Sequence, residues 1–600
     1  MHVRARTTSW LVIATVSALV GLGPKASNSQ STDKPTVVYL NQAWSAQDRA
    51  DYYWTSQGSA LLSYDIYLAL AVAGSDTLFN SPASAETFGL LLDGPDPKNN
   101  PDGLAIGITK AVVSSGQFKG VYAGVTCAAC HTGQVQYKGQ QIRLDGGING
   151  RIELPRWIKS LSASLDATLS EPARFQRLLQ RVRARGPADE ADLRMRLRAD
   201  ANSLRAIATE AFLEPFDAGP GRVDALGDIH NAFAAVSTGI RENSRPTIAP
   251  VKPPFVWNAP QSAWVQWSGI VNNPLPRNFG ETLGVFARYD LKSASPDSGL
   301  FETTSDVKGL IKIEHLLRRL APPQWPEAVL GKLDQAKAAQ GKELFTQNCA
   351  ECHAAYPYRW SAELKQGKRM IENALVPLSV VGTDDTQFAS PAFDPRPTML
   401  TGPLAPLFDG HEVISKTEMT RVLIAPMLRK AVERAGPFTS AELIDMNGYA
   451  NFGDEPLAKG PVRSYKAAPR DGVWGTGPFL HNGSVPNMYE LLSPASARSK
   501  TFPVGRDFDP VKLGLDTSQP SGSYLFDTAL VGNSNAGHSF QSGSGAGIIG
   551  RELTEAERYA MIEYLKSIPN EPGRVTAYGG PEKPLLAADD PTWFNTKDPY

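Results

Sequence analysis

The stretch GVTCAACHTG (124–133) and its counterpart NCAECH (348–353) decide how this chain folds and what it can bind. Each contains the pattern C-x-x-C-H, and together they use all four cysteines of the 600-residue chain. Two thiols on one turn can form thioethers with the vinyl groups of a haem, and the adjacent histidine can bind the iron. The sequence therefore predicts two covalent c-type haems, attached through Cys127, Cys130, Cys349 and Cys352, with His131 and His353 as iron ligands.

Two other roles for paired cysteines compete with haem attachment. A zinc site normally takes four cysteine or histidine ligands, and neither motif has a second ligand pair close in the sequence. Disulfides within each motif would leave the adjacent histidines without a role. Haem attachment accounts for all of these residues and is the interpretation we favour.

Length and composition indicate a globular protein of two domains. Six hundred residues exceed what one hydrophobic core usually serves. The formal net charge of -1 predicts no general attraction for nucleic acid. A proline-rich stretch, 321–326, is the expected junction between an N-terminal haem domain with substrate-pocket insertions (30–320) and a C-terminal cytochrome c domain (321–600). We expect a mainly α fold, in which two cytochrome-c-like helical domains each carry one covalent haem and are joined by long ordered loops with little β structure.

The N-terminus has the pattern of a secretory signal peptide over residues 1–29. Positive residues precede an apolar run over 10–23, and small residues follow at 26–29. An uncleaved membrane anchor is the alternative, but the run is short for a permanent span. We expect a mature protein in the periplasm or outside the cell that is not an integral membrane protein.

One predicted helix directly precedes the second motif, and another lies near the end of the C-terminal half. Residues 334–348 and 553–568 have apolar positions at helical spacing, and Thr554 with Glu557 forms a capping box at the start of the later one. The pair resembles the first and last helices of a cytochrome c domain, which cross through a small residue and an aromatic.

A sixth ligand decides whether a haem iron transfers electrons or reacts with oxygen. His538 lies in GNSNAGHSF (532–540), shortly before the last predicted helix, where a cytochrome c domain supplies its distal ligand. We expect His538 to bind the second haem. His481 and several methionine thioethers are the alternatives. No comparable histidine is evident for the first haem, but the aromatic-rich segment 255–289 can form either an ordinary core or an apolar distal pocket.

Four segments resemble the exported di-haem oxygenases, a family that includes rubber oxygenases and fatty-acid dioxygenases and is related to bacterial di-haem cytochrome c peroxidases. They are GVTCAACHTGQVQYKGQQIRLDGG (124–147), VQWSGIVNNPLPRNFGETLGVF (265–286), GPFLHNGSVPNMYELLSP (477–494) and GNSNAGHSF (532–540). The resemblance implies that His131 binds an iron whose far side is free for O2. It also implies a six-coordinate second haem held by His353 and His538. The family's distal pocket uses phenylalanine and tryptophan, for which Phe279 with Trp264 or Trp267 are the nearest matches, although Phe286 lies close by.

These observations favour a dioxygenase that adds O2 to an unsaturated apolar chain, such as oleate or polyisoprene. A peroxidase that takes electrons from a small donor protein and a plain di-haem electron carrier are the alternatives. A Ca²⁺ ion between the haems is left open.

Overall fold

The computed structural model describes residues 36–269, 274–353, 358–361, 370–389, 397–399, 404–408, 413–439, 442, 463–518 and 524–568. The predicted signal peptide, residues 1–29, lies outside this part of the chain. Among the described helices, none is both long and apolar enough to cross a membrane.

The expected mainly α fold is wrong. The structure is 40% helix and 16% strand, with several small sheets, and the described residues do not show two cytochrome c domains. The difference is largest around the first C-x-x-C-H motif, which lies between two β-hairpins. Strands β3 (Ile108–Val113) and β4 (Gly120–Val125) pair before it, and β5 (Thr132–Tyr137) and β6 (Gln140–Asp145) pair after it.

The physical reason is visible in the side-chain pattern of these strands. Strand β3 reads ITKAVV, and its burial pattern alternates between the two faces at its centre. Such alternation of β-branched residues is typical of a half-buried strand. Each hairpin gains a third strand, because β2 (Leu62–Ser63) pairs with β4 and β1 (Val37–Tyr39) pairs in parallel with β6.

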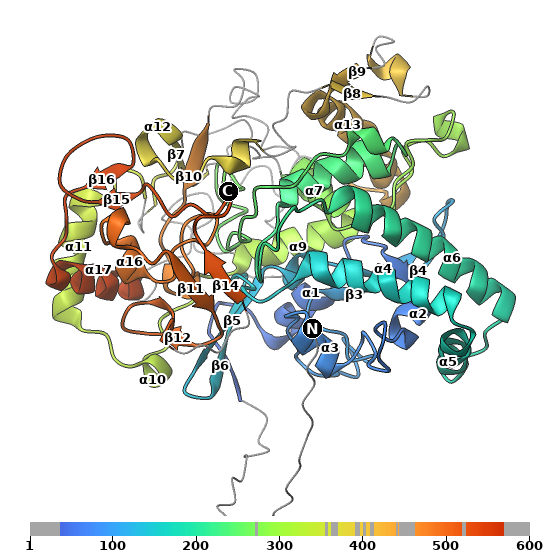
Figure 1. Ribbon diagram of the computed structural model, residues 1–600, viewed down its shortest axis with the longest axis horizontal. Helices are drawn as coiled ribbons and strands as arrows, with labels where there is room; N and C mark the ends of the chain where they lie inside the picture. Colours follow the sequence, from blue (N-terminus) through green and yellow to red (C-terminus); the bar gives the residue numbers. More distant parts are fainter. Residues whose placement is uncertain are drawn as a thin grey trace, which may run out of the picture.

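Helices surround these sheets in the first half of the chain. They are α1 (Ala46–Trp54), α2 (Tyr64–Ala69), α3 (Pro82–Thr87), α4 (Leu154–Ser170), α5 (Pro172–Arg183), α6 (Glu190–Ala206), α7 (Ala225–Asn231), α8 (Pro274–Gly284) and α9 (Val307–Arg319). Helices α4, α5 and α6 form one end of the molecule, opposite the end formed by α11 and α17 (Figure 1). A large hydrophobic cluster joins α4–α6 to the sheet of β2–β4 through buried residues such as Trp157, Leu161 and Leu197.

The second half combines helices with short β-ladders. Its helices are α10 (Glu327–Leu330), α11 (Gln335–Asn348), α12 (Leu378–Val381), α13 (Lys416–Ala435), α16 (Met488–Leu491) and α17 (Glu555–Ser567). Its strands are β7 (Ala374–Pro377), β8 (Pro397–Met399), β9 (Val413–Ser415), β10 (Ser464–Ala467), β11 (Thr501–Val504), β12 (Phe508–Asp509), β13 (Gly514–Leu515), β14 (Tyr524–Asp527), β15 (Ser539–Phe540) and β16 (Ile548–Gly550). The hydrophobic cluster of this half also contains Ile142 and Leu144 of β6. The predicted boundary at 321–326 stays a prediction.

Helices α11 and α17 pack closely, as the sequence predicts. Thr554 and Glu557 form the expected capping box of α17. A Cβ atom on Gly341 would lie 2.0 Å from the carbonyl oxygen of Ala560, so only glycine allows this approach. The rings of Phe345 and Tyr564 lie 5.2 Å apart beside it.

We expect Gly341→Ala to lower the free energy of unfolding by about 1–3 kcal/mol, because the helices must separate to admit the methyl group. This loss should outweigh the gain in helix propensity that alanine brings, which is about 1 kcal/mol. Urea unfolding followed by circular dichroism measures the change. Gly186→Ala is the control, because a Cβ there meets nothing within 4 Å. Equal stability of the two variants would contradict the packing argument.

Candidate functional site

The first C-x-x-C-H motif forms a single tight turn between β4 and β5. Residues Cys127–Ala129 are a 3₁₀ turn, and the His131 amide donates to the Cys127 carbonyl oxygen over 2.9 Å. The turn therefore brings both thiols and the imidazole together. All four cysteines of the chain are free thiols in this structure. Over the described ranges, no group of three or more His, Cys, Asp or Glu side chains is arranged to hold a metal ion.

The His131 imidazole is fixed by a backbone carbonyl. Its Nδ1 lies 2.7 Å from the carbonyl oxygen of Pro254, a distance that requires Nδ1 to carry the proton. The Nε2 lone pair is then available to a metal, which is the usual arrangement of metal-binding histidines. Burial lowers the pKa of His131 to about 4, so the ring is neutral at pH 7.

The second motif repeats this arrangement at the end of α11. The amide of His353 donates to the Cys349 carbonyl oxygen over 2.8 Å. Its Nδ1 lies 3.1 Å from the carbonyl oxygen of Ala468, which directly follows β10. Burial holds the pKa of His353 well below its usual value, and the charges of Arg470 and His538 add to this effect.

His538 faces His353, as the sequence predicts. The two ring centroids lie 6.2 Å apart with an interplanar angle of 49°. Two imidazoles that bind one metal from opposite sides, with metal–nitrogen bonds of about 2 Å, have ring centres about 6 Å apart. The observed spacing therefore fits a haem iron between the rings. Burial lowers the pKa of His538 to about 3, which keeps its ring in the neutral, metal-binding form.

The loop that carries His538 is held by one arginine. Arg498 donates to the carbonyl oxygens of Asn535, Gly537 and His538 at 2.5, 2.9 and 2.8 Å. All three bonds go to backbone oxygens and none to the imidazole. Nδ1 of His538 is buried and has no hydrogen-bond partner among the described residues. The loop geometry therefore does not depend on the imidazole.

The structure does not gather the three predicted distal aromatics into one cluster. Phe279 is fully buried on α8 in a cluster with Phe233, Leu283 and Met427. Trp264 packs in a small cluster of its own. Trp267 packs beside Tyr465, and its Nε1 donates to the Lys252 carbonyl oxygen over 2.7 Å. Their role as one pocket stays a prediction.

Polar residues that the sequence did not single out lie beside the first motif. The Gln57 amide oxygen is 3.2 Å from the Cys127 sulfur. The charges of Glu281 and Arg277 on α8 both act on the Cys127 thiol, whose pKa is raised mainly by burial. Arg277 pairs with Glu314 at 2.6 Å. In the sequence, these polar residues could have been suspected only from the two charged residues, Arg277 and Glu281, in the predicted helical segment. No local spacing connects that segment to the first motif.

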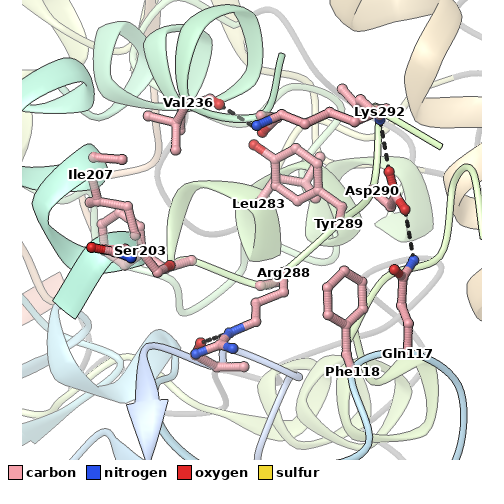
Figure 2. A pocket seen from close by; sticks show the side chains of 18 of the residues that line it. Gln117, Phe118, Ser203, Ile207, Val236, Leu283, Arg288, Tyr289, Asp290 and Lys292 are labelled. Carbon is pink, nitrogen blue, oxygen red and sulfur yellow. Dashed lines mark hydrogen bonds between the residues drawn. The ribbon is translucent and has the colours of Figure 1, made fainter. Parts of the chain in front are cut away.

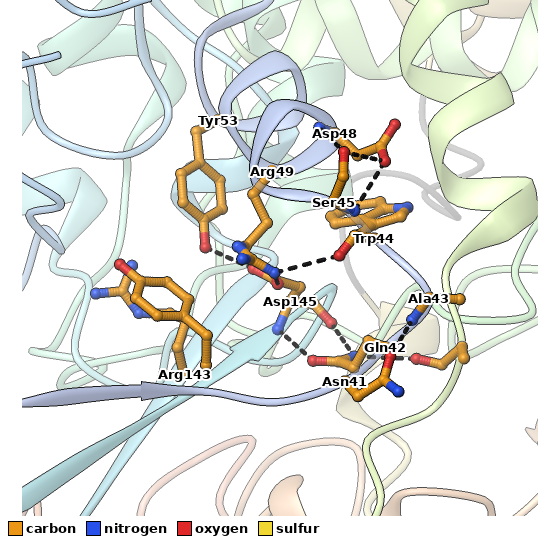
Figure 3. Close-up of polar contacts among 12 residues, drawn as sticks. Asn41, Gln42, Ala43, Trp44, Ser45, Asp48, Arg49, Tyr53, Arg143 and Asp145 are labelled. Atoms are coloured by element: carbon orange, nitrogen blue, oxygen red, sulfur yellow. Dashed lines mark hydrogen bonds and ion pairs between the residues drawn. The ribbon is translucent and has the colours of Figure 1, made fainter.

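A buried hydrogen-bond network centred on Asp145 connects helix α1 with strand β6, the second strand after the first motif. Tyr53, Arg49 and Gln42 converge on Asp145 (Figure 3). The Tyr53 hydroxyl donates to the Asp145 carboxylate over 2.5 Å, and Gln42 bonds both the amide and the carbonyl of Asp145. Asp145 is paired across the hairpin with Thr132, the residue after His131. The network therefore fixes the strands that hold the motif.

A cavity of about 610 Å³ opens beyond the C-terminal end of α8. Its walls are largely apolar and include Ile207, Val236, Leu283, Phe286 and Tyr289, whereas charged side chains of Arg288, Asp290 and Lys292 also line it (Figure 2). The Phe286 carbonyl oxygen accepts from the Ala60 amide over 3.0 Å. Ala60 lies three residues after Gln57, so one short segment contacts both the cavity wall and the first motif.

His481 makes no ring contact with either motif histidine among the described residues and pairs with Tyr465. Its Nε2 is 2.9 Å from the Tyr465 hydroxyl, and the rings stack at 4.1 Å. Burial lowers the pKa of His481 to about 3, with the charges of Arg222 and Lys252 adding to the shift.

This pair predicts a pH dependence of stability. The pKa of His481 is about 6.5 in the unfolded chain and about 3 in the folded protein. At pH values between these two, the unfolded state therefore binds one more proton at His481 than the folded state does. Stability should therefore fall as pH drops through this window, by up to about 1.4 kcal/mol per pH unit from this site. We expect His481→Gln, which keeps a polar group beside Tyr465, to flatten the slope measured by urea unfolding at pH 4.5, 5.5 and 6.5. Parallel slopes for both proteins would contradict the assignment.

Comparison with known proteins supports a haem-binding chain. Residues 464–503 match the family model described as RoxA-like, cytochrome c-like, and this segment contains the Ala468 carbonyl that anchors His353. The uncharacterized protein y4iJ of Sinorhizobium fredii (strain NBRC 101917 / NGR234) is 33% identical over 580 residues, which covers 89% of this chain and 93% of that protein. The uncharacterized protein y4iM of the same strain is 25% identical over 334 residues, covering 52% of this chain and 63% of that protein. A cytochrome c-like segment implies a haem c group and suggests an oxidoreductase.

Proposed function

The chain belongs to the same family as the y4iJ protein and carries a RoxA-like, cytochrome c-like segment, and from this we propose that it is an exported di-haem c-type dioxygenase. One haem is attached at Cys127 and Cys130 and the other at Cys349 and Cys352. The reaction adds both atoms of O2 to a double bond of an apolar chain, so it needs no external reductant. The product is a hydroperoxide or a pair of carbonyl compounds.

The observation that carries this proposal is the difference between the two motif histidines. His353 faces His538 at a spacing that fits a closed, six-coordinate iron. His131 is anchored through Nδ1, and within the described ranges the one contact between two histidine rings is that of His353 with His538. One haem closed by protein and one open to a small ligand is the arrangement that an oxygenase with a supporting redox centre requires.

The cavity at the end of α8 supports an apolar substrate. A haem with a vacant position supplies the oxygen chemistry, whereas the residues of this chain bind the substrate and exclude water. Leu283, Phe286 and Tyr289 form apolar walls of this cavity. Phe286 is bonded to Ala60, which belongs to the same short segment as Gln57, the residue that contacts Cys127. Arg288 is already paired with Asp200 at 2.9 Å, which leaves the Lys292 ammonium as the cation for a fatty-acid carboxylate.

Oxygen uptake tests the proposal against its alternatives. The purified protein is mixed with oleate or with polyisoprene latex, without reductant, in an oxygen electrode, and the products formed under ¹⁸O2 are analysed by mass spectrometry. A dioxygenase consumes O2 and places both labelled atoms in the product. A peroxidase instead needs H2O2 and a donor protein, and an electron carrier does neither. If both haems are six-coordinate and neither binds CO after reduction, the oxygenase proposal fails.

Phe279 is the aromatic whose role is easiest to test. We expect Phe279→Leu to lower turnover about tenfold without loss of haem, because Phe279 packs in one cluster with Leu283 of the cavity wall, and a loosened wall lets the substrate take an unproductive position. Phe301→Leu is the matched control, since Phe301 belongs to the same hydrophobic cluster and is not among the residues that line the cavity. Initial O2 uptake rates and haem content are compared for the two variants. A wild-type rate for Phe279→Leu would remove Phe279 from the site.

A further inference from the structure

One backbone carbonyl in the second haem site serves three donors. The Ala468 oxygen lies 3.1 Å from Nδ1 of His353 and also accepts from Nε and Nη2 of Arg470, at 2.8 and 2.6 Å. A carbonyl oxygen has two lone pairs, so the imidazole and the guanidinium compete for them. The guanidinium has the shorter contacts, and its charge draws electron density from the oxygen.

The first site differs in this respect. The Pro254 carbonyl accepts from His131 at 2.7 Å, and no side chain within the described ranges shares it with the imidazole. A strong bond from Nδ1–H makes an imidazole a more electron-donating ligand, because the proton is partly withdrawn. His353, with the longer and shared bond, is therefore the weaker donor of the two.

The charge of Arg470 acts on the same site directly. Burial lowers its pKa to about 10, so the guanidinium remains positive at pH 7. This charge contributes to the lowered pKa of both His353 and His538. The nearby carboxylate of Asp471 offsets part of it, whereas Lys466, whose pKa burial lowers to about 7, carries only part of a positive charge at pH 7.

We infer that Arg470 raises the reduction potential of the haem attached at Cys349 and Cys352. Two effects have the same sign. A buried positive charge near the iron favours the ferrous state, which carries one positive charge less, and a weakly donating His353 stabilises the ferric state less. The inference rests on the proposed attachment of haem at both motifs.

Spectroelectrochemical titration of the full-length holoprotein tests this inference. Arg470→Gln keeps donors near Ala468 but removes the charge, and at a fixed potential we expect it to lower the ratio of reduced to oxidised second haem at least tenfold, which is 59 mV for a one-electron couple. Arg470→Lys keeps the charge and should return the ratio to within about threefold of wild type. The first haem is the internal control and should not shift. Arg174→Gln, which removes a buried arginine of α5 at the opposite end of the molecule from α11 and α17, is the external control.

The outcomes are distinguishable. An unchanged second haem in Arg470→Gln, or an equal shift of both haems, overturns the inference while the proposed function stands. If haem staining shows no haem on the second motif of the wild-type protein, the proposed function and the inference fall together. Should Arg470→Gln not fold, Arg470→Met removes the same charge with a side chain of similar stem length and must give the same shift.

Discussion

Replacing His131 by glutamine should lower O2 consumption with oleate or latex more than about 100-fold, because even residues that only orient a metal ligand change activity 10–100-fold. The haem should remain attached, since the thioether bonds to Cys127 and Cys130 do not involve the imidazole. The reason for the loss is electronic as well as steric. The Nδ1 bond to Pro254 makes His131 a strong donor to the iron, and glutamine offers no equivalent ring nitrogen.

The measurement combines an oxygen electrode with the pyridine haemochrome spectrum, which counts haems independently of activity. Adding imidazole to the small cavity variant His131→Gly should restore part of the rate. His230→Gln is the matched control, because Nδ1 of His230 makes the same kind of bond, 2.7 Å to the Leu226 carbonyl oxygen, on α7 and outside both C-x-x-C-H motifs. A wild-type rate in His131→Gln with both haems present would show that the oxygen chemistry is elsewhere.

The parts of the site that the sequence could predict are those formed within a few residues. Cys127, Cys130 and His131 belong to one turn, so their spacing alone specifies their geometry. The same holds for the capping box of α17. The pairing of α11 with α17 was also predictable, because Gly341 lies on the apolar face of α11, where only a small residue allows close packing.

Other features depend on contacts between distant segments, which no local pattern encodes. The carbonyl partners of His131 and His353 are 123 and 115 residues away along the chain. The sheets around the first motif were mistaken for loops, because their strands are short and are separated by glycine- and serine-containing turns. Aromatic density over 255–289 indicated burial correctly, but Phe279, Trp264 and Trp267 belong to three different clusters. The number of aromatic residues in a segment does not distinguish a ligand pocket from separate parts of the hydrophobic core.

Replacing His538 by asparagine should raise the amount of CO bound by the reduced protein from one to two molecules per chain. On the proposed function, His353 and His538 close the second iron of the wild-type protein, and only the first haem accepts CO. Asparagine removes the imidazole, and it tolerates the left-handed backbone of this position, where φ is 43°. Titration with CO, followed by the absorbance change of each haem, counts the binding sites.

This result would report on the ligand itself, because the loop does not depend on the side chain that is removed. Arg498 holds it through three backbone carbonyls, including that of His538. The variant His538→Met keeps a potential iron ligand in the same position, so it should retain one CO site and change only the spectrum. Two CO molecules on the wild-type protein would mean that the 6.2 Å approach of His353 and His538 does not enclose an iron. One CO molecule on His538→Asn would assign the sixth ligand to another residue, and it would leave the open position at His131 untouched.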